Sequence, residues 1–173
     1  MIQIYCGEGK GKTTAAAGLA VRAAGNRIPV IFAQFMKDGN SGEIAVLKEI
    51  PGIRVLYPDL FYGFVRNMDE QQKEEMRIQY ITLLNKIEKE MEGMQADMAV
   101  IVLDEVLHAC NFGLLEEDRL CRFLDHCPDT AELILTGWNP SRELIRRADY
   151  ISEIKKVKHP FDKGIPARRG IEF

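Results

Sequence analysis

The stretch CGEGKGKTT, residues 6–14, constrains the fold more than any other part of the sequence. It follows an apolar run, Ile2–Cys6, that is predicted to be a strand, and it precedes a helical run, Thr13–Ala24. Glycines between such elements let backbone N–H groups converge on anionic oxygens, and the helix N-terminus adds partial positive charge. The sequence therefore predicts a phosphate-binding loop. Its predicted residues are Gly7, Glu8, Gly9, Lys10, Gly11, Lys12, Thr13 and Thr14.

Two side chains of this loop are predicted to be catalytic. Lys12 would reach the phosphates, and the Thr13 hydroxyl would coordinate Mg²⁺ or Mn²⁺, hard cations that prefer oxygen ligands. The loop departs from the pattern G-x-x-x-x-G-K-[ST], because Cys6 stands where the first glycine is expected, and Gly7 and Gly9 would supply the missing flexibility. The alternative is a glycine-rich hairpin turn followed by a capped helix.

A second element of a nucleotide site is the run VIVLDE, residues 100–105, which is predicted to be a buried strand that ends in two carboxylates. Ligands of parallel sheets bind beyond the carboxyl ends of the strands, so Asp104 and Glu105 are expected at the same edge as the glycine-rich loop. They are candidate ligands of the metal ion, directly or through water. Taken alone, the acidic pair would equally be explained as a cap of the next helix. Together with the loop, it favours nucleotide binding.

Short apolar runs alternate with helical patterns, which is typical of a parallel sheet covered on both faces. One helix is predicted over Asp69–Glu92, with Gly93 after its end. Another is predicted to begin near Asn139 as its N-cap, with Pro140 at the first helical position. We expect a single domain over residues 1–173. The predicted strands are Ile2–Cys6, Ile28–Phe35, Ile53–Tyr57, Met98–Leu103, Ala131–Thr136 and Tyr150–Val157.

Composition argues against two classes of partner. The 173 residues carry 23 basic and 26 acidic side chains, with a net charge of -3 and no long basic run, so nucleic acid is not expected. The longest apolar run, Met98–Leu103, is too short to cross a bilayer, and the N-terminus lacks the pattern of a secretion signal. A cytoplasmic protein without membrane association is therefore expected. The four cysteines contain no Cys-x-x-Cys pair and are expected to be free thiols.

Longer stretches resemble the ATP:corrinoid adenosyltransferases, the type that modifies cob(I)alamin and cob(I)yrinic acid a,c-diamide. The resemblance is carried by GEGKGKTTAAAGLAVRAAG near the start, QFMKDGNSGE at 34–43, VIVLDE at 100–105 and the closing stretch that begins TGWNPSRELIRRADYISEI. It implies a doubly wound α/β, mostly parallel, RecA-like P-loop fold with ATP and a reduced corrinoid as substrates. The implied reaction transfers the 5′-deoxyadenosyl group of ATP to cobalt and leaves triphosphate.

The resemblance also implies a corrinoid-binding residue, Phe64, which matches one aromatic of the family pattern Gly-Phe-Thr-Trp. Arg66 stands in place of the Trp, and Phe61 or Tyr62 is a candidate replacement. Such aromatics would exclude the lower axial ligand of the cobalt and so make the metal easier to reduce. The alternative for Phe64 is a loop anchor that packs on the core.

Two further positions bear on the implied site. Trp138 stands where the family usually has Arg, and Arg142 or Arg146 would restore the lost charge. His159 lies in the family-like closing stretch and is the second candidate corrinoid-binding residue, with an ordinary surface histidine as the alternative. The resemblance further implies a homodimer and an electron-donating reductase as partner. Two other function classes remain open at this point: a phosphotransferase or ATPase, and a catalytically silent module that binds nucleotide and corrinoid.

Overall fold

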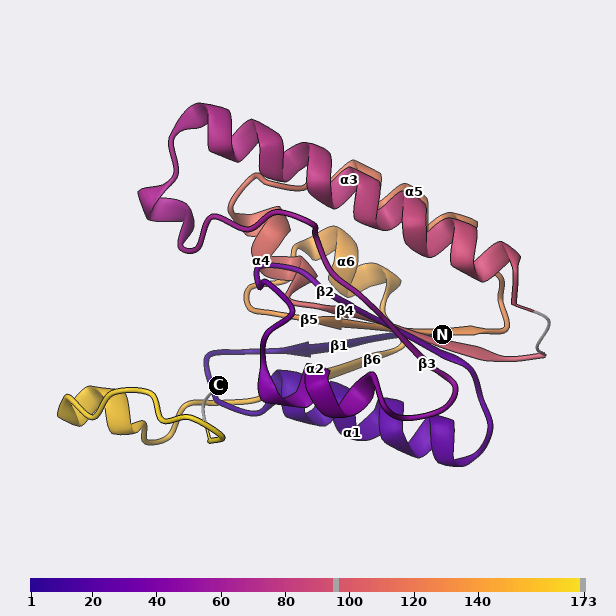
Figure 1. Ribbon diagram of the computed structural model, residues 1–173, viewed down its shortest axis with the longest axis horizontal. Helices are drawn as coiled ribbons and strands as arrows, with labels where there is room; N and C mark the ends of the chain where they lie inside the picture. The colour runs from indigo at the N-terminus through magenta and orange to yellow at the C-terminus, as the bar shows by residue number, and fades with distance from the viewer. Residues whose placement is uncertain (95–96, 172–173) are drawn as a thin grey trace.

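A sheet of six strands runs through the described residues, 1–94 and 97–171, of this computed structural model (Figure 1). The strands are β1 (Ile2–Cys6), β2 (Val30–Gln34), β3 (Ile53–Leu56), β4 (Ala99–Asp104), β5 (Ala131–Thr136) and β6 (Tyr150–Glu153). Their order in space is β3-β2-β4-β5-β1-β6, and every neighbouring pair is parallel. The strands β2, β4 and β5 are buried almost throughout, as expected where both faces of a sheet are covered.

Helices cover both faces of this sheet. One face carries α1 (Lys12–Gly25) and α2 (Gly42–Leu47), and the opposite face carries α3 (Glu70–Glu92), α4 (Val106–Asn111), α5 (Glu117–His126) and α6 (Arg142–Arg147) (Figure 1). Each face buries its own apolar cluster, with alanines of α1 on one side and aromatic and leucine side chains of α3 and α5 on the other. This arrangement confirms the predicted doubly wound α/β, RecA-like P-loop fold class.

The helix α3 follows its prediction closely. Asp69 is the N-cap, and a capping box joins it to Gln72, because each residue accepts a hydrogen bond from the backbone N–H of the other. The helix ends at Glu92, before Gly93. Neither α3, the longest described helix, nor any other described helix is long and apolar enough to span a bilayer. The residues of α3 buried against the sheet are Met76, Tyr80, Leu83, Leu84 and Ile87.

The helix predicted to begin near Asn139 begins later, and that prediction is wrong. Asn139 has a φ of 49°, whereas an N-cap takes an extended backbone, and neither Asn139 nor Pro140 is helical. Ser141 is the actual N-cap, and its hydroxyl accepts a hydrogen bond from the N–H of Leu144. The first helical residue is therefore Arg142.

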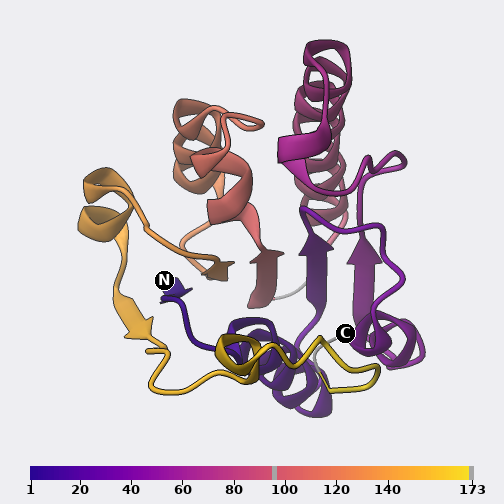
Figure 2. The same cartoon turned by 90° about the vertical axis from the view of Figure 1, so that its left-hand side faces the viewer.

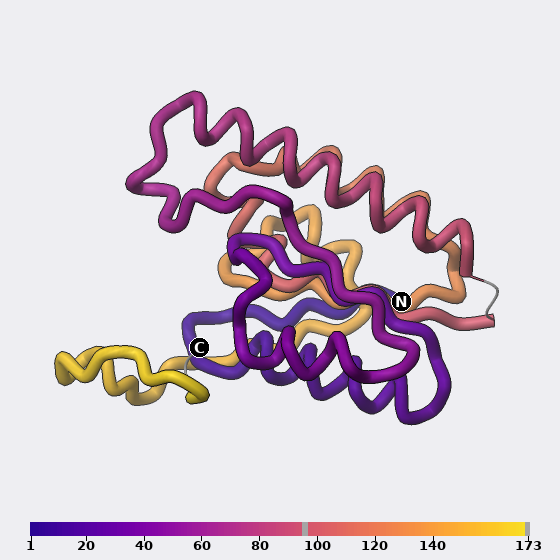
Figure 3. Tube along the Cα trace, viewed as in Figure 1, coloured from indigo at the N-terminus to yellow at the C-terminus, as the bar shows by residue number. Residues whose placement is uncertain are grey.

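The last strand is also shorter than predicted. β6 ends at Glu153, not at Val157, because Ile154 turns to bond with the loop that follows β1. Beyond it, residues 155–171 form a tail that extends away from the sheet and then returns toward the N-terminus of α1 (Figure 3). A short 3₁₀ helix, Pro160–Lys163, lies within the tail. Two apolar side chains of the tail are largely exposed, Val157 at 87% and Phe161 at 74%.

Candidate functional site

The segments that follow β1, β2 and β4 meet at one edge of the sheet and line a pocket of about 770 Å³. Residues 10–14, from the loop after β1 and the start of α1, form one wall. Lys37 comes from the loop after β2, Glu105 directly follows β4, and His108 lies on α4. Two residues of the tail, Gly170 and Ile171, also line it. Figure 2 shows this tail, in yellow, passing beside α1. The two predicted halves of a nucleotide site therefore share one pocket.

Within the loop, Lys12 and Gly11 take the positions that a phosphate site requires. Gly11 is the N-cap of α1 with a φ of 119°, a left-handed conformation that favours glycine. Lys12 is then the first helical residue, and its ammonium donates to the carbonyls of Gly7 at 2.7 Å and Gly9 at 2.9 Å. Burial lowers the pKa of Lys12 below its usual value, while Glu105 and Asp104 act in the opposite direction.

The first glycines of the loop have a structural role of their own. The N–H of Gly9 donates to the carbonyl of Ile154 at 2.7 Å, and the N–H of Ile154 donates to the carbonyl of Cys6 at 2.8 Å. A Cβ atom on Gly7 would lie 2.5 Å from the Ile154 carbonyl oxygen, and one on Gly9 would lie 2.7 Å from it. Both positions therefore need glycine because another backbone passes beside them. Of the predicted phosphate residues, Gly7, Glu8 and Gly9 are not among those that line the pocket.

Asp104 is the buried centre of the site. Its Oδ1 accepts hydrogen bonds from the hydroxyl of Thr13 at 2.9 Å and from that of Thr136 at 2.7 Å. The amide of Gln34 donates to Oδ2 at 3.3 Å, and the Gln34 Oε1 is buried without a hydrogen-bond partner among the described residues. Thr13 and Asp104 thus place a hydroxyl and a carboxylate side by side, an oxygen donor set that fits Mg²⁺ or Mn²⁺.

Lys37 is a member of the site that sequence reasoning missed. Its ammonium lies 3.6 Å from a carboxylate oxygen of Glu43, 3.7 Å from Asp104 and 3.6 Å from Glu105. Burial alone would lower the pKa of Lys37, but these carboxylates raise it. Gln34 ends β2, and Lys37 follows it. Because β2 pairs with β4, the strand order would have identified both residues as neighbours of Asp104.

Glu105 and His108 are two side chains of the pocket that lie close to each other. Glu105 has a φ of 61°, and burial raises its pKa to about 7 although Lys37 opposes the shift. The His108 Nδ1 lies 3.8 Å from a carboxylate oxygen of Glu105 and is buried without a hydrogen-bond partner among the described residues. Burial lowers the pKa of His108 to about 4, and the nearby charges of Lys12 and Lys37 add to this effect. His108 is therefore neutral at pH 7.

The two predicted corrinoid residues lie outside the residues that line this pocket. Phe64 is 72% exposed on the loop before the 3₁₀ turn Val65–Asn67, and the guanidinium of Arg66 lies 5.3 Å from its ring centre. This exposure contradicts the alternative of an anchor packed on the core. The Nδ1 of His159 accepts a hydrogen bond from the N–H of Phe161 at 3.2 Å, at the start of the 3₁₀ helix in the tail.

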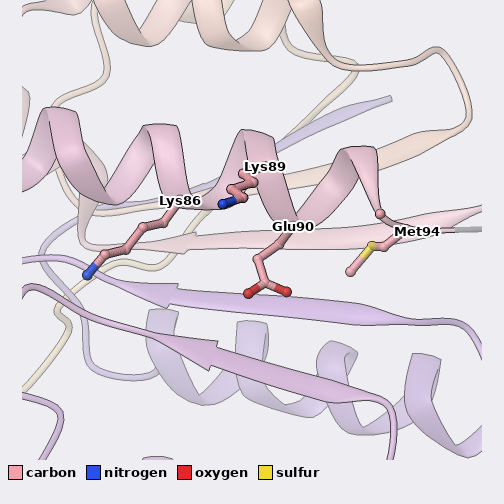
Figure 4. A pocket seen from close by; sticks show the side chains of 5 residues that line it. Lys86, Lys89, Glu90 and Met94 are labelled. Carbon is pink, nitrogen blue, oxygen red and sulfur yellow. The ribbon is translucent and has the colours of Figure 1, made fainter.

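A second hollow lies far from this chemistry, at the end of α3 (Figure 4). Two of its charged side chains are paired across to neighbouring elements: Lys86 contacts Asp59 at 3.0 Å, and Glu90 contacts Arg54 at 3.3 Å. Gly93 and Met94 of the hollow follow the C-terminal end of α3 and precede the amino end of β4 at Ala99. Ligands of parallel sheets bind at the carboxyl end. We therefore assign the hollow no part in the nucleotide site.

Comparisons with known proteins identify the family of the chain. The profile of a family described as "ATP:corrinoid adenosyltransferase BtuR/CobO/CobP" matches residues 1–173. A corrinoid adenosyltransferase of Pseudomonas aeruginosa is 30% identical over 174 residues, which cover all of this chain and 83% of that protein. A corrinoid adenosyltransferase of Escherichia coli K12 and the corrinoid adenosyltransferase CobA of Salmonella typhimurium are each 30% identical over the whole chain and 85% of their own lengths.

Among solved structures, ATPases 2 and 3 of EssC from Geobacillus thermodenitrificans align with 98% of this chain at a TM-score of 0.49 and 14% identity. This chain spans 34% of that protein. The assignment therefore depends on the family profile and on the curated relatives, which cover this chain from end to end. The chain belongs to the family of ATP:corrinoid adenosyltransferases, enzymes that transfer an adenosyl group from ATP to a corrinoid.

Proposed function

We propose that this enzyme transfers the 5′-deoxyadenosyl group of ATP to the cobalt of cob(I)alamin or cob(I)yrinic acid a,c-diamide and releases intact triphosphate. The observation that carries the proposal is the meeting of Lys12, Thr13 and Glu105 in one pocket, with the Thr13 hydroxyl in direct hydrogen-bond contact with the buried Asp104 beneath it. In this reaction the reduced cobalt attacks C5′, a cobalt–carbon bond forms, and the C5′–oxygen bond breaks with its electron pair staying on the triphosphate. No proton transfer to the nucleophile is needed.

The protein's contribution is to bind, to orient and to stabilise charge. Lys12 would leave the carbonyls of Gly7 and Gly9 and grip the triphosphate, which gathers negative charge as the C5′–oxygen bond breaks. The N-terminus of α1 adds partial positive charge at the same place. Thr13 with Asp104 or Glu105 would hold Mg²⁺ or Mn²⁺, and that ion would neutralise part of the polyanion.

The corrinoid is proposed to approach from the side of Phe64 and His159. The exposed ring of Phe64 offers an apolar surface that would exclude a lower axial ligand from the cobalt. We further propose that the enzyme works in the cytoplasm as a homodimer and receives its reduced corrinoid through an electron-donating reductase. Its 173 residues would then form one catalytic domain.

The test is to incubate the protein with ATP, Mg²⁺ and chemically reduced corrinoid while the visible spectrum is recorded. Formation of a cobalt–carbon bond together with release of triphosphate would support the proposal. Release of ADP or phosphate would instead identify a phosphotransferase or ATPase. Binding of both substrates without any spectral change under strong reductant would identify a silent binding module and overturn the enzymatic proposal. Running cobalamin and the diamide in parallel decides which acceptor is preferred.

A further inference from the structure

The turn after β5, residues 137–139, carries the only tryptophan of the sequence, and its ring lies beside that of His108, which lines the nucleotide pocket. Trp138 is 39% exposed, so part of its ring is accessible to a ligand. The strand β5 lies between β4, which ends in Asp104, and β1, which leads into the phosphate-binding loop. The turn that bears Trp138 therefore lies between the two halves of the proposed ATP site.

The backbone of this turn is fixed on both sides of Trp138. Gly137 has a φ of 146°, and a Cβ atom there would lie 2.5 Å from the Cβ of Leu107, so the turn packs tightly on α4. The side-chain amide of Asn111 donates to the carbonyl of Trp138 at 2.7 Å and to that of Asn139 at 3.4 Å. A half-exposed ring held by so constrained a backbone is preorganised for binding.

The ring environment joins Trp138 to the pocket. The His108 ring, which lines the pocket, lies 5.9 Å from the Trp138 ring between centres, and the Phe112 ring lies 6.4 Å from it. Of the described residues that line the pocket, His108 is the only one with an aromatic ring. The lysines and hydroxyls of the lining suit phosphates, but they offer no flat surface to a nucleobase.

We propose that the adenine ring of ATP stacks on the indole of Trp138, which makes Trp138 a specificity-determining residue for the nucleoside end of the substrate. This inference rests on the proposed placement of the triphosphate at Lys12 and Thr13. The base is tied to the phosphates through the ribose, so it must lie close to them, and the turn after β5 is next to the loop in sheet order. Phe64 follows β3, three strands from β5, and remains the surface assigned to the corrinoid.

The experiment uses Trp138 as its own reporter, because no other tryptophan contributes to the fluorescence. ATP with Mg²⁺, added without corrinoid, is expected to quench the emission, whereas inorganic tripolyphosphate with Mg²⁺ is expected to bind without quenching. Trp138→Leu is expected to raise the Kd for ATP roughly 5- to 100-fold, the range of a base-stacking contact, and to leave the Kd for tripolyphosphate unchanged. Trp138→Phe, which keeps an aromatic ring, is expected to stay within about threefold of the wild type.

Three results would overturn the inference: no quenching by ATP, an unchanged Kd for ATP in Trp138→Leu, or an equal loss of ATP and tripolyphosphate. If Trp138→Leu raised only the KM for corrinoid, the ring would contact the corrin instead of the base. Lys12→Ala separates this inference from the proposed function, because it should weaken ATP and tripolyphosphate alike. If Lys12→Ala weakened the binding of neither ligand, the proposed phosphate placement would be wrong. If Lys12→Ala weakened both ligands as expected but Trp138→Leu had no effect, only the stacking would be rejected. Circular dichroism of each variant establishes that it is folded.

Discussion

The phosphate-binding loop and the tail at residues 155–171 lie next to each other but are built in opposite ways. The loop is tied to the sheet by the hydrogen bond from the Gly9 N–H to the Ile154 carbonyl, and the Thr13 hydroxyl that follows the loop bonds to the fully buried Asp104. In the tail, the side chains of Val157 and Phe161 are largely exposed to solvent. The contrast teaches that the phosphate half of the site is preformed by the chain itself, whereas the surfaces proposed for the corrinoid gain their contacts from the substrate.

Gly7→Ala is the strongest way to break the preformed half. A methyl group at Gly7 meets the Ile154 carbonyl oxygen and also has to adopt a φ of 102°, so it combines a clash with backbone strain. We expect the free energy of unfolding to fall by about 2–5 kcal/mol in urea denaturation. Gly11→Ala is the matched control, because its φ of 119° carries the strain while no atom lies within 4 Å, and a loss of about 1–2 kcal/mol is expected. Equal losses would show that Ile154 does not constrain the loop.

Lys12→Ala tests the same half through chemistry instead of folding. Removal of a charge-stabilising donor beside the leaving triphosphate is expected to raise the barrier by about 2–4 kcal/mol, so that transfer falls at least tenfold. The measurement is kcat for cobalt–carbon bond formation. Lys89→Ala, in the hollow at the far end of α3, is expected to keep full activity. Unchanged transfer in the Lys12 variant would contradict the proposed loop geometry.

The buried pair beside the loop predicts a pH effect on stability. The pKa of His108 is lowered to about 4 in the folded state, so its contribution is present above the unfolded value near 6.5 and is lost as pH falls toward 4. The loss amounts to about 3 kcal/mol at most. Glu105, with its pKa raised to about 7, acts in the opposite direction, since its contribution is lost as pH rises through 7. The measurement is the free energy of unfolding of the wild type and of His108→Gln between about pH 4 and 6.5. The difference between the two curves isolates the contribution of the histidine. Parallel curves would show that His108 contributes nothing to the pH dependence.

The exposed half is expected to respond least in stability. Phe64 makes few contacts within the chain, so Phe64→Ala should change the free energy of unfolding by less than about 0.5 kcal/mol. The same variant should raise the KM for corrinoid roughly 3- to 10-fold, the range of one aromatic contact, without changing the Kd for ATP. Ile78→Ala, exposed on α3, is the control that should change neither value. A large loss of stability in Phe64→Ala would place the residue in the preformed half instead.

The sequence predicted what is decided locally. The strand, glycine-rich loop and helix at residues 2–25 are specified by neighbouring residues, and so is the run that ends in Asp104 and Glu105. Asp69–Glu92 was predictable for the same reason, because its apolar spacing and its cap are both short-range signals.

Features that depend on strand order could not be predicted in this way. Lys37 joins the site only because β2 lies beside β4, and nothing within residues 30–43 indicates that pairing. The need for glycine at Gly7 and Gly9 comes from Ile154, far away in sequence. The start of α6 was misplaced because Asn139 adopts a left-handed conformation within the tight turn that follows β5, which local N-cap preference does not reveal.

The tie between Gly9 and Ile154 has a consequence for how the enzyme matures. The residues that would hold the nucleotide are synthesised well before the backbone of Ile154, which braces them. Until residue 154 has emerged and docked at the edge of the sheet, the nascent chain carries the complete phosphate-binding motif without its support. Competence to hold ATP should therefore arise abruptly, once β6 has completed the sheet.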